Sequence, residues 1–258
     1  MERDKKIAIA FLSLFILIGL IILTIYIVRS RSNTPSTVPV TPTPAGPTPA
    51  PTPLPTPPTP STKILGVGTA NDLYTKVNLI SPWVSVGTNG CCVIDVIQLS
   101  DGTFLGVGTD HTLYTRQTLT SNWGPLGAQT CGVTEVMQAA DGTIYGVGLD
   151  NQIYKTSSVT TTMTGPIDSG KIMSLQQAPD GTFIGVGLDN QLYVSKQLGT
   201  GWTVVPNSGS VKSIQVTPDG KIIGVGMKND LYIRNSLTDS WASTGLNNCC
   251  ALSTTYYK

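Results

Sequence analysis

Charged side chains are scarce in this sequence, and histidine is almost absent. Asp, Glu, Lys and Arg make up 12% of the 258 residues, and the formal net charge is +1. No stretch interleaves basic with aromatic residues, so the chain lacks the electrostatic footprint of a nucleic-acid-binding protein. The single histidine, His111, leaves little scope for histidine-based catalysis. We therefore expect no nucleic-acid partner.

Enzyme and metal motifs are missing as well. The sequence contains no Gly-x-Ser-x-Gly, no His-Glu-x-x-His and no recognisable set of base and nucleophile. The cysteines have no Cys-x-x-Cys spacing, which leaves a zinc or thioredoxin-like site without support. We expect a protein that is not an enzyme, with no catalytic residue, no metal and no cofactor. The odd count leaves at least one thiol unpaired within the chain among Cys91, Cys92, Cys131, Cys249 and Cys250.

One long hydrophobic run follows a short N-terminal tail, residues 1–6. Residues 7–28 carry no charge and, as a helix, would span roughly 33 Å, enough to cross a membrane. A cleavable signal peptide has a shorter apolar region, about 7–15 residues, and a small-residue cleavage site. We therefore favour one uncleaved transmembrane helix. The positive-inside rule narrowly keeps the N-terminus cytoplasmic, because three basic residues precede the run and two follow it: Arg3, Lys5, Lys6, Arg29 and Arg31.

Residues 29–62 form a stalk that is almost entirely Pro and Thr from residue 34 onward. Such a sequence extends as polyproline II, at about 3.1 Å per residue, and would reach roughly 90 Å. Two interpretations stay open, an O-glycosylated spacer outside the cell and a bare semi-rigid linker. Either one predicts a single-pass membrane protein that carries residues 63–258 outside the cell or on a viral envelope.

Residues 63–258 consist of five copies of a repeat about forty residues long. Gly-Val-Gly begins at positions 66, 106, 146, 185 and 224, and Leu-Tyr or Ile-Tyr follows each copy. Asp-Gly precedes the last four copies. A fixed period of this length is typical of propellers and solenoids. A tryptophan follows in four copies and a methionine in the third, at Trp83, Trp123, Met163, Trp202 and Trp241.

Each repeat predicts four short antiparallel strands, a to d, and no helix. In the second repeat the strands are expected at 93–99, 103–108, 113–117 and 123–127, with an Asp-Gly hairpin turn between the first two. The first repeat lacks strand a, while residues 251–257 match strand a and then the chain stops. We therefore predict an all-β fold, a five-bladed β-propeller of four-stranded blades whose ring the C-terminal strand closes.

The two glycines of Gly-Val-Gly face the same side of their strand and form a strip without side chains. A phosphate-binding loop would need a following helix, which the pattern does not provide. We expect a large side chain of the neighbouring blade, such as a tryptophan, to pack on this strip. The tryptophans could serve as stacking platforms for sugar rings or as wedges between blades, and we favour the wedge.

The repeat resembles that of tectonin-type propeller lectins, the family of tachylectin-2. The frame Asp-Gly-x-Phe/Ile-x-Gly-Val-x-x-Asp-x-x-Leu-Tyr, followed by Trp, carries the resemblance over residues 63–258. It implies a five-bladed ring closed by a C-terminal strand, and N-acetylhexosamine sites with a Gly-Gly-Trp motif before strand a. In that place this chain has Asn89-Gly90-Cys91-Cys92, Thr130-Cys131-Gly132, Ser169-Gly170-Lys171, Ser208-Gly209-Ser210 and Asn248-Cys249-Cys250.

The strand order predicts that the b–c turns and the d–a crossovers share one face, which points away from the stalk. Polar residues there are candidate contacts to a sugar or glycoprotein, because function often lies on loops of a rigid scaffold. Asn and Asp are also good turn formers, and we favour that role for any single residue. The candidates are Asn71, Asp72, Asn89, Asp110, His111, Gln129, Asp150, Asn151, Asp168, Asp189, Asn190, Asn207, Asn229, Asp230 and Asn248.

All five cysteines fall in three successive crossovers of the same face. They predict either disulfides between neighbouring crossovers, if the Cα atoms lie within about 7 Å, or free thiols.

Our leading hypothesis for function is a membrane-anchored recognition module that binds carbohydrate or a glycosylated partner. The second is a structural or protein-interaction component of a cell or virion surface, without sugar specificity. The sequence leaves the ligand and the oligomeric state open.

Overall fold

The computed structural model describes residues 63–126, 132–168, 170–245 and 250–258. All of these residues belong to one compact unit, Pro57–Lys258. The predicted tail, transmembrane helix and stalk, residues 1–62, lie outside the described residues. Within the described part of the chain, no helix has the length and apolar character needed to span a membrane.

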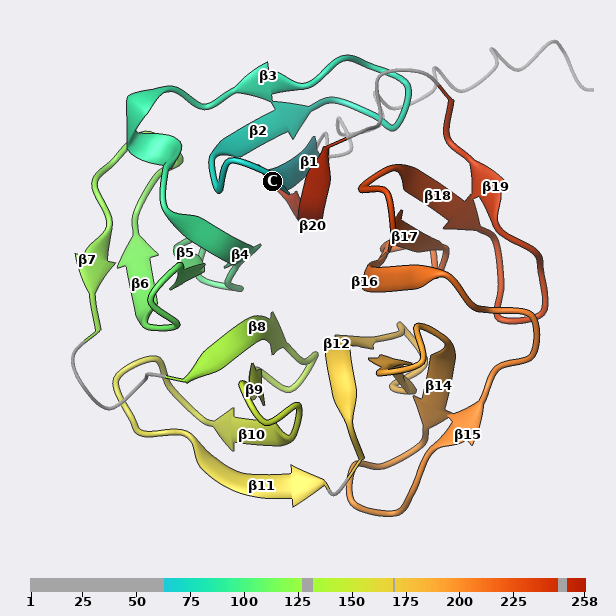
Figure 1. Cartoon of the computed structure of the whole chain (residues 1–258). Coiled ribbons are helices and arrows are strands. Elements are labelled where there is room, and N and C mark those ends of the chain that lie inside the picture. Colours follow the sequence, from blue (N-terminus) through green and yellow to red (C-terminus); the bar gives the residue numbers. More distant parts are fainter. Residues whose placement is uncertain (1–62, 127–131, 169, 246–249) are drawn as a thin grey trace, which may run out of the picture. The chain divides into compact units, whose positions relative to one another are not determined.

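The described residues form five four-stranded antiparallel sheets, which stand as blades around a central axis (Figure 1). From the centre outward, blade 1 contains β20 (Ala251–Tyr257), β1 (Lys63–Gly68), β2 (Leu73–Lys76) and β3 (Val84–Ser85), and blade 2 contains β4 (Val93–Gln98), β5 (Phe104–Gly108), β6 (Leu113–Arg116) and β7 (Gly124–Pro125). Blade 3 contains β8 (Val133–Gln138), β9 (Ile144–Gly148), β10 (Ile153–Thr156) and β11 (Thr164–Asp168). Blade 4 contains β12 (Ile172–Gln177), β13 (Phe183–Gly187), β14 (Leu192–Ser195) and β15 (Thr203–Val204), and blade 5 contains β16 (Val211–Val216), β17 (Ile222–Gly226), β18 (Leu231–Arg234) and β19 (Ala242–Ser243). The predicted all-β five-bladed propeller is therefore confirmed.

The C-terminal strand closes the ring. β20 pairs antiparallel with β1, from Lys63 opposite Tyr257 to Gly68 opposite Ala251. It thus supplies the innermost strand that the first repeat lacks, as the phase of the repeats predicts. Without this pairing β1 would expose a row of unpaired backbone groups toward the centre.

Hydrophobic clusters fill the spaces between neighbouring blades. Leu65 and Val67 of blade 1, for example, pack with Val93 and Val96 of blade 2, and all four are almost fully buried. Comparable clusters join the other blades, so the core consists of five inter-blade layers rather than one centre. Because both faces of the middle strands are covered by neighbouring blades, their sequences are nearly continuous apolar runs.

The first glycine of each Gly-Val-Gly lies under a large side chain of its own blade. A Cβ atom at Gly106 would lie 2.7 Å from Cη2 of Trp123, and one at Gly146 would lie 2.7 Å from the sulfur of Met163. The expectation that a neighbouring blade supplies this side chain is wrong, because the tryptophan precedes the outer strand and folds back across its own sheet. Trp123 also packs against the cluster that blades 1 and 2 share, and its role as a wedge between blades stays a prediction.

A ring of equivalent side chains ties the innermost strands together. Asp95 accepts a hydrogen bond from the Val136 backbone N–H (2.9 Å), and Glu135 accepts one from Leu175 (2.7 Å). Ser174 continues the pattern in blade 4, accepting from the backbone N–H of Ile214 at 3.0 Å. Each of these side chains stands opposite the valine of Gly-Val-Gly in its own blade, and the ring comprises Asp95, Glu135, Ser174, Ser213 and Ser253.

The two carboxyl groups of this ring are buried, with Asp95 5% and Glu135 6% exposed. Burial raises the pKa of Asp95 from 3.8 to about 6, against the opposing effect of its backbone hydrogen bonds. Burial, and then the charge of Asp95, raise the pKa of Glu135 well above its ordinary value. The charged forms are disfavoured because the site is removed from water.

Candidate ligand-binding site

The same type of hollow recurs on the face of the b–c turns in three blades. Its volume is about 250 Å³ in blade 1, about 390 Å³ in blade 4 and about 350 Å³ in blade 5. Each hollow is lined by the second glycine of Gly-Val-Gly, the tyrosine of the third strand, the tryptophan before the fourth strand and the residue before the innermost strand. The two larger volumes lie within the range of about 300–1,000 Å³ that is usual for ligand sites.

The glycine strip lets two aromatic side chains lie close to the sheet. A Cβ atom at Gly226 would lie 2.7 Å from Cε2 of Tyr232, and one at Gly224 would lie 2.8 Å from Cη2 of Trp241. The repeated Gly-x-Gly therefore places a tyrosine and a tryptophan on one floor, because any side chain at those positions would displace them.

Cation–π contacts and hydrogen bonds of the indole N–H groups hold the tryptophan rings in place. In blade 5 the guanidinium of Arg234 lies 5.2 Å from the ring centroid of Trp241, whose Nε1 donates to the Ser208 carbonyl oxygen at 3.0 Å. Trp202 of blade 4 donates to the Asp168 carboxylate at 3.1 Å. These contacts fix the rings before any ligand arrives, which lowers the entropic cost of binding.

In blades 2 to 4 an aspartate of the b–c turn orients the tyrosine. The Tyr114 hydroxyl donates to the Asp110 carboxylate at 2.8 Å, which lowers the pKa of Asp110 and raises that of Tyr114. The pairs Tyr154–Asp150 (3.0 Å) and Tyr193–Asp189 (2.8 Å) repeat this bond. Each aspartate also accepts from the backbone N–H two residues later, so these three predicted site residues cap their turns beside the aromatic floor.

The third residue after Gly-Val-Gly occupies a left-handed turn position in every blade. His111 and Asn151, for example, have φ values of 62° and 60°, a left-handed conformation that asparagine tolerates well. Their backbone carbonyls accept hydrogen bonds from the start of the next innermost strand, as in Ile172 to Asn151 at 2.9 Å. The turn-forming role that we favour for these residues is confirmed for the set Asn71, His111, Asn151, Asn190 and Asn229.

Two of the crossover candidates, Asp168 and Asn89, are engaged in hydrogen bonds of the fold. Asp168 is 5% exposed and accepts from the backbone N–H groups of Gly170 (2.7 Å) and Gly199 (2.6 Å) as well as from Trp202. Asn89, in the short 3₁₀ helix η1 (Thr88–Gly90), donates to the Thr120 carbonyl oxygen at 2.8 Å.

The remaining candidates split between turn positions and residues that the structure leaves undescribed. Asn207 has a φ of 54°. Asp72 and Asp230 accept turn hydrogen bonds through their backbone carbonyls. Gln129 and Asn248 lie outside the described residues.

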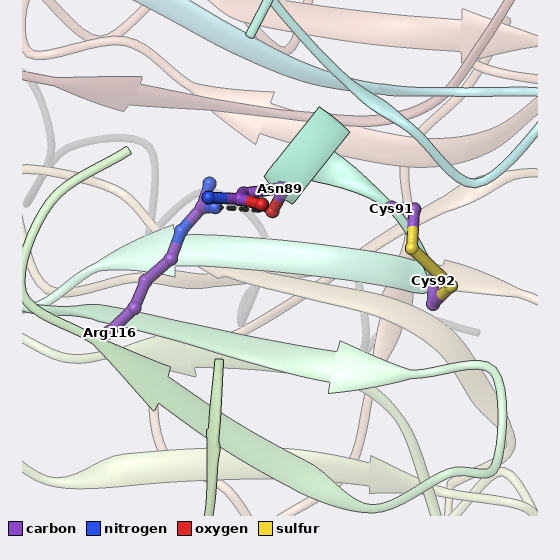
Figure 2. Close-up of a disulfide and its surroundings, with 4 residues drawn as sticks. All are labelled: Asn89, Cys91, Cys92 and Arg116. Carbon is purple, nitrogen blue, oxygen red and sulfur yellow. Dashed lines mark hydrogen bonds between the residues drawn. A yellow bond between two sulfur atoms is a disulfide. The ribbon is translucent and has the colours of Figure 1, made fainter. Parts of the chain in front are cut away.

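One disulfide joins Cys91 to Cys92, which are adjacent in sequence with Cα atoms 3.8 Å apart. Figure 2 shows this bridge next to η1, where the Arg116 guanidinium donates to the Asn89 carbonyl oxygen at 2.9 Å. The bridge therefore lies within one crossover and does not join two, unlike the inter-crossover bridge that the sequence suggests. Of the other cysteines, Cys250 lines the hollow of blade 1, and Cys131 and Cys249 lie outside the described residues.

A larger hollow, about 410 Å³, opens near the axis on the face of the a–b turns. Glutamines of four blades contribute to its wall, but the side-chain oxygens of two of them already accept backbone N–H groups: Gln98 from Lys258 and Gln138 from Ser100, both at 2.8 Å. These hydrogen bonds connect neighbouring blades. We therefore consider the aromatic hollows of the opposite face the better candidate.

Sequence reasoning missed the tyrosines as site residues. The signal was present, because a tyrosine follows every Gly-Val-Gly at a fixed distance although a partly exposed strand position does not require one. It also missed three residues that the crossovers and turns bring to the rims, Lys171, Ser210 and Lys228. Within the described residues, no group of three or more His, Cys, Asp or Glu side chains is arranged to hold a metal ion.

Three solved structures that match this chain share little sequence with it. A protein proposed to be a gluconolactonase has 13% identity and a TM-score of 0.50, and the match covers 73% of this chain and 75% of that one. YCF48 from Cyanidioschyzon merolae has 15% identity and a TM-score of 0.43, over 59% of this chain and 55% of that one. YCF48 bound to D1 peptide has 14% identity and a TM-score of 0.41, over 69% and 62%.

No protein with a curated description matches the sequence. The family model of the tectonin domain, in contrast, matches residues 59–247, well over half of the chain. This range includes all four tryptophans and all five copies of Gly-Val-Gly. The match and the five-bladed propeller agree with each other, and the chain belongs to the tectonin family, with a lectin-type propeller fold.

Proposed function

We propose that the propeller is a carbohydrate-recognition head that binds glycans in the aromatic hollows of its b–c turn face. The observation that carries this proposal is the recurrence of one floor, a tyrosine and a tryptophan over paired glycines, in three blades. A pyranose ring has an apolar C–H face that packs on an aromatic ring, and hydroxyl groups that bond to a polar rim. A small pocket with an apolar floor and a few polar groups suits such a ligand.

Repetition of the hollow favours multivalent binding. Several weak sites on one rigid face raise the avidity for a branched or clustered glycan without any new contact. A surface that carries many copies of one sugar is therefore the partner that the arrangement suits best.

The proposal includes the presentation of this face away from a membrane. Residues 7–28 would anchor the chain with a cytoplasmic N-terminus, and residues 29–62 would carry the head outside a cell or virion. The direction of β1 supports this orientation, because Lys63 begins the strand and Gly68, which lines a hollow, ends it.

We propose a binding role without catalysis. A fold likeness at 13% identity brings no gluconolactonase activity to this chain. The carboxylates nearest the hollows, Asp110, Asp150 and Asp189, are bonded to tyrosines, and the shifts toward lower pKa keep them ionised. None of the three has the raised pKa that a general acid needs at neutral pH.

A glycan array tests the proposal with the full-length chain in a detergent without a sugar head group. We expect binding to a restricted set of glycans, and a loss of roughly tenfold or more in apparent affinity when the tyrosines of the three hollows are changed together. The substitutions are Tyr74→Ser, Tyr193→Ser and Tyr232→Ser. Val84→Ser is the matched control, because Val84 is 59% exposed on the outer strand of blade 1. If the folded wild-type protein bound no glycan on the array, carbohydrate recognition would be refuted.

A second candidate function, contact with a protein, is favoured by one observation. The residue after Gly-Val-Gly is a large exposed hydrophobic in three successive blades: Leu149 (57% exposed), Leu188 (52%) and Met227 (56%). Exposed apolar groups that gather on one face mark protein contact surfaces. Leu188 and Met227 also line the hollows of blades 4 and 5, whereas Leu149 lines none of the three hollows. A Leu149→Ser variant that keeps its glycan binding but loses a cell-surface partner would favour this function.

A further inference from the structure

The hollows of the five blades differ in charge at one equivalent position, two residues after Gly-Val-Gly. Blades 2 to 4 carry an aspartate there, Asp110, Asp150 and Asp189, each bonded to its tyrosine hydroxyl. Blade 1 carries Ala70, and blade 5 carries Lys228. The charge is therefore reversed in blade 5 relative to three other blades of the same ring.

Lys228 lies on the wall of the blade 5 hollow together with Tyr232 and Trp241. Its side chain is exposed, and among the described residues it forms no ion pair within 4.0 Å. Within the same part of the chain, the Tyr232 hydroxyl has no hydrogen-bond partner, because the aspartate that binds the equivalent tyrosine elsewhere is replaced by Lys228. Blade 5 thus offers a ligand an ammonium group and a hydroxyl donor beside one aromatic floor.

Positively charged side chains outnumber negatively charged ones around the blade 5 hollow. Lys212 extends to the same turn, where its ammonium donates to the side-chain oxygen of Asn229. Asp230 is the acidic residue of that turn, and its backbone carbonyl accepts from Gly226 at 2.9 Å. Two cations and one anion leave a net positive charge. The corresponding turn of blade 2 carries Asp110 and no lysine, and at the turn of blade 3 one cation, Lys171, donates to the Asp150 carbonyl oxygen at 2.7 Å beside one aspartate.

We propose that the hollow of blade 5 binds a carboxylate-bearing pyranose, so that the propeller recognises acidic glycans at this blade and neutral sugars at others. The sugar ring would pack on Trp241 and Tyr232, and its carboxylate would accept from the Lys228 ammonium and the Tyr232 hydroxyl. Charge-assisted hydrogen bonds of this kind are shorter and stronger than neutral ones. This inference rests on the proposed function, since it specifies the ligand class of one of its sites.

The test compares methyl glucuronide with methyl glucoside, which differ only in the carboxylate, by saturation-transfer NMR titration of the full-length chain in sugar-free detergent. We expect wild-type protein to bind the acidic sugar roughly tenfold more tightly, the effect of about one charge-assisted hydrogen bond at a partly exposed site. The preference should weaken as salt rises, because exposed charges are screened.

Three variants assign the preference to blade 5. Lys228→Asp restores the residue that blades 2 to 4 carry, so it should fold, bond to Tyr232 and abolish the preference. Gly209→Trp should block the hollow, because Gly209 lines it and a Cβ atom there would lie no closer than 3.6 Å to Gln191, which leaves room for the larger side chain to start without a clash. Ala70→Lys is the reciprocal change and should create a preference for the acidic sugar in blade 1. Thermal unfolding of each variant checks that the ring is intact.

The outcomes separate this inference from the proposed function. Binding of neutral glycans with no preference for the acidic sugar, or a preference that survives in folded Lys228→Asp, overturns the inference alone. A folded wild-type protein that binds no sugar on the array or in the titration overturns the proposed function and this inference with it.

Discussion

Asp95→Asn should stabilise the propeller at neutral pH, although it removes a charged residue from a hydrogen-bonded ring. The carboxylate accepts from the Val136 N–H at 2.9 Å, and the side-chain oxygen of asparagine can accept the same bond. The substitution therefore keeps the shape and the bond but removes the titration.

The magnitude follows from the pKa of Asp95, which burial raises from 3.8 to about 6. The folded state then binds a proton more tightly than the unfolded state, so the contribution to stability is full below about pH 4 and is lost as pH rises through 6. A shift of about two pKa units corresponds to about 3 kcal/mol, which wild type loses by about pH 7 and the variant does not. For a domain of this size the difference is about 6–12 °C in melting temperature.

Tryptophan fluorescence during thermal unfolding measures the effect in the full-length chain, because all four tryptophans lie within the propeller. The variant should match wild type at pH 4 and melt at a higher temperature at pH 7.5. Asp101→Asn is the control: hydrogen bonds from Thr103 lower the pKa of this exposed carboxyl, so the change should give no gain at pH 7.5. Equal behaviour of wild type and Asp95→Asn at both pH values would show that the Asp95 carboxyl is not desolvated, and the reasoning would fail.

Two further predictions concern the ring itself. Gly106→Ala should destabilise the fold by roughly 1–3 kcal/mol, because its Cβ atom would lie 2.7 Å from Trp123. The control is Gly124→Ala in the same blade, which should leave the melting temperature nearly unchanged, because its Cβ atom would meet only the Thr115 carbonyl at 3.7 Å. Equal effects of the two substitutions would contradict this packing. Deletion of residues 250–258 removes β20 and should abolish cooperative unfolding in calorimetry, since β1 loses its inner partner; a truncated chain that unfolds in one transition at the wild-type temperature would show that the ring does not depend on this strand.

The architecture of residues 63–258 was predictable from the sequence because the information is local and repeated. The spacing of Gly-Val-Gly, the Asp-Gly turns and the alternation of apolar residues recur five times, so each copy supports the interpretation of the others. The closure by residues 251–257 followed from the phase of the repeats alone, and the pairing of β20 with β1 confirms it.

The candidate site was predictable only in part. The sequence indicated the correct face, and it indicated that asparagines and aspartates form its turns, since left-handed turn positions restrict the residue types. It did not show that Trp123 folds onto a glycine of its own blade rather than a neighbour's. Strand assignment says which side of a sheet a residue faces, but not how far a long side chain reaches across it.

What the sequence by itself determined is therefore the number of blades, their strand order and the phase in which the ring closes, because these depend on a period along the chain. The tertiary structure alone decided which groups meet between repeats. It brought the carboxyls of Asp95 and Glu135 into one buried ring, in which each accepts a backbone N–H of the next blade. Such contacts depend on the curvature and packing of whole blades, which no single repeat encodes.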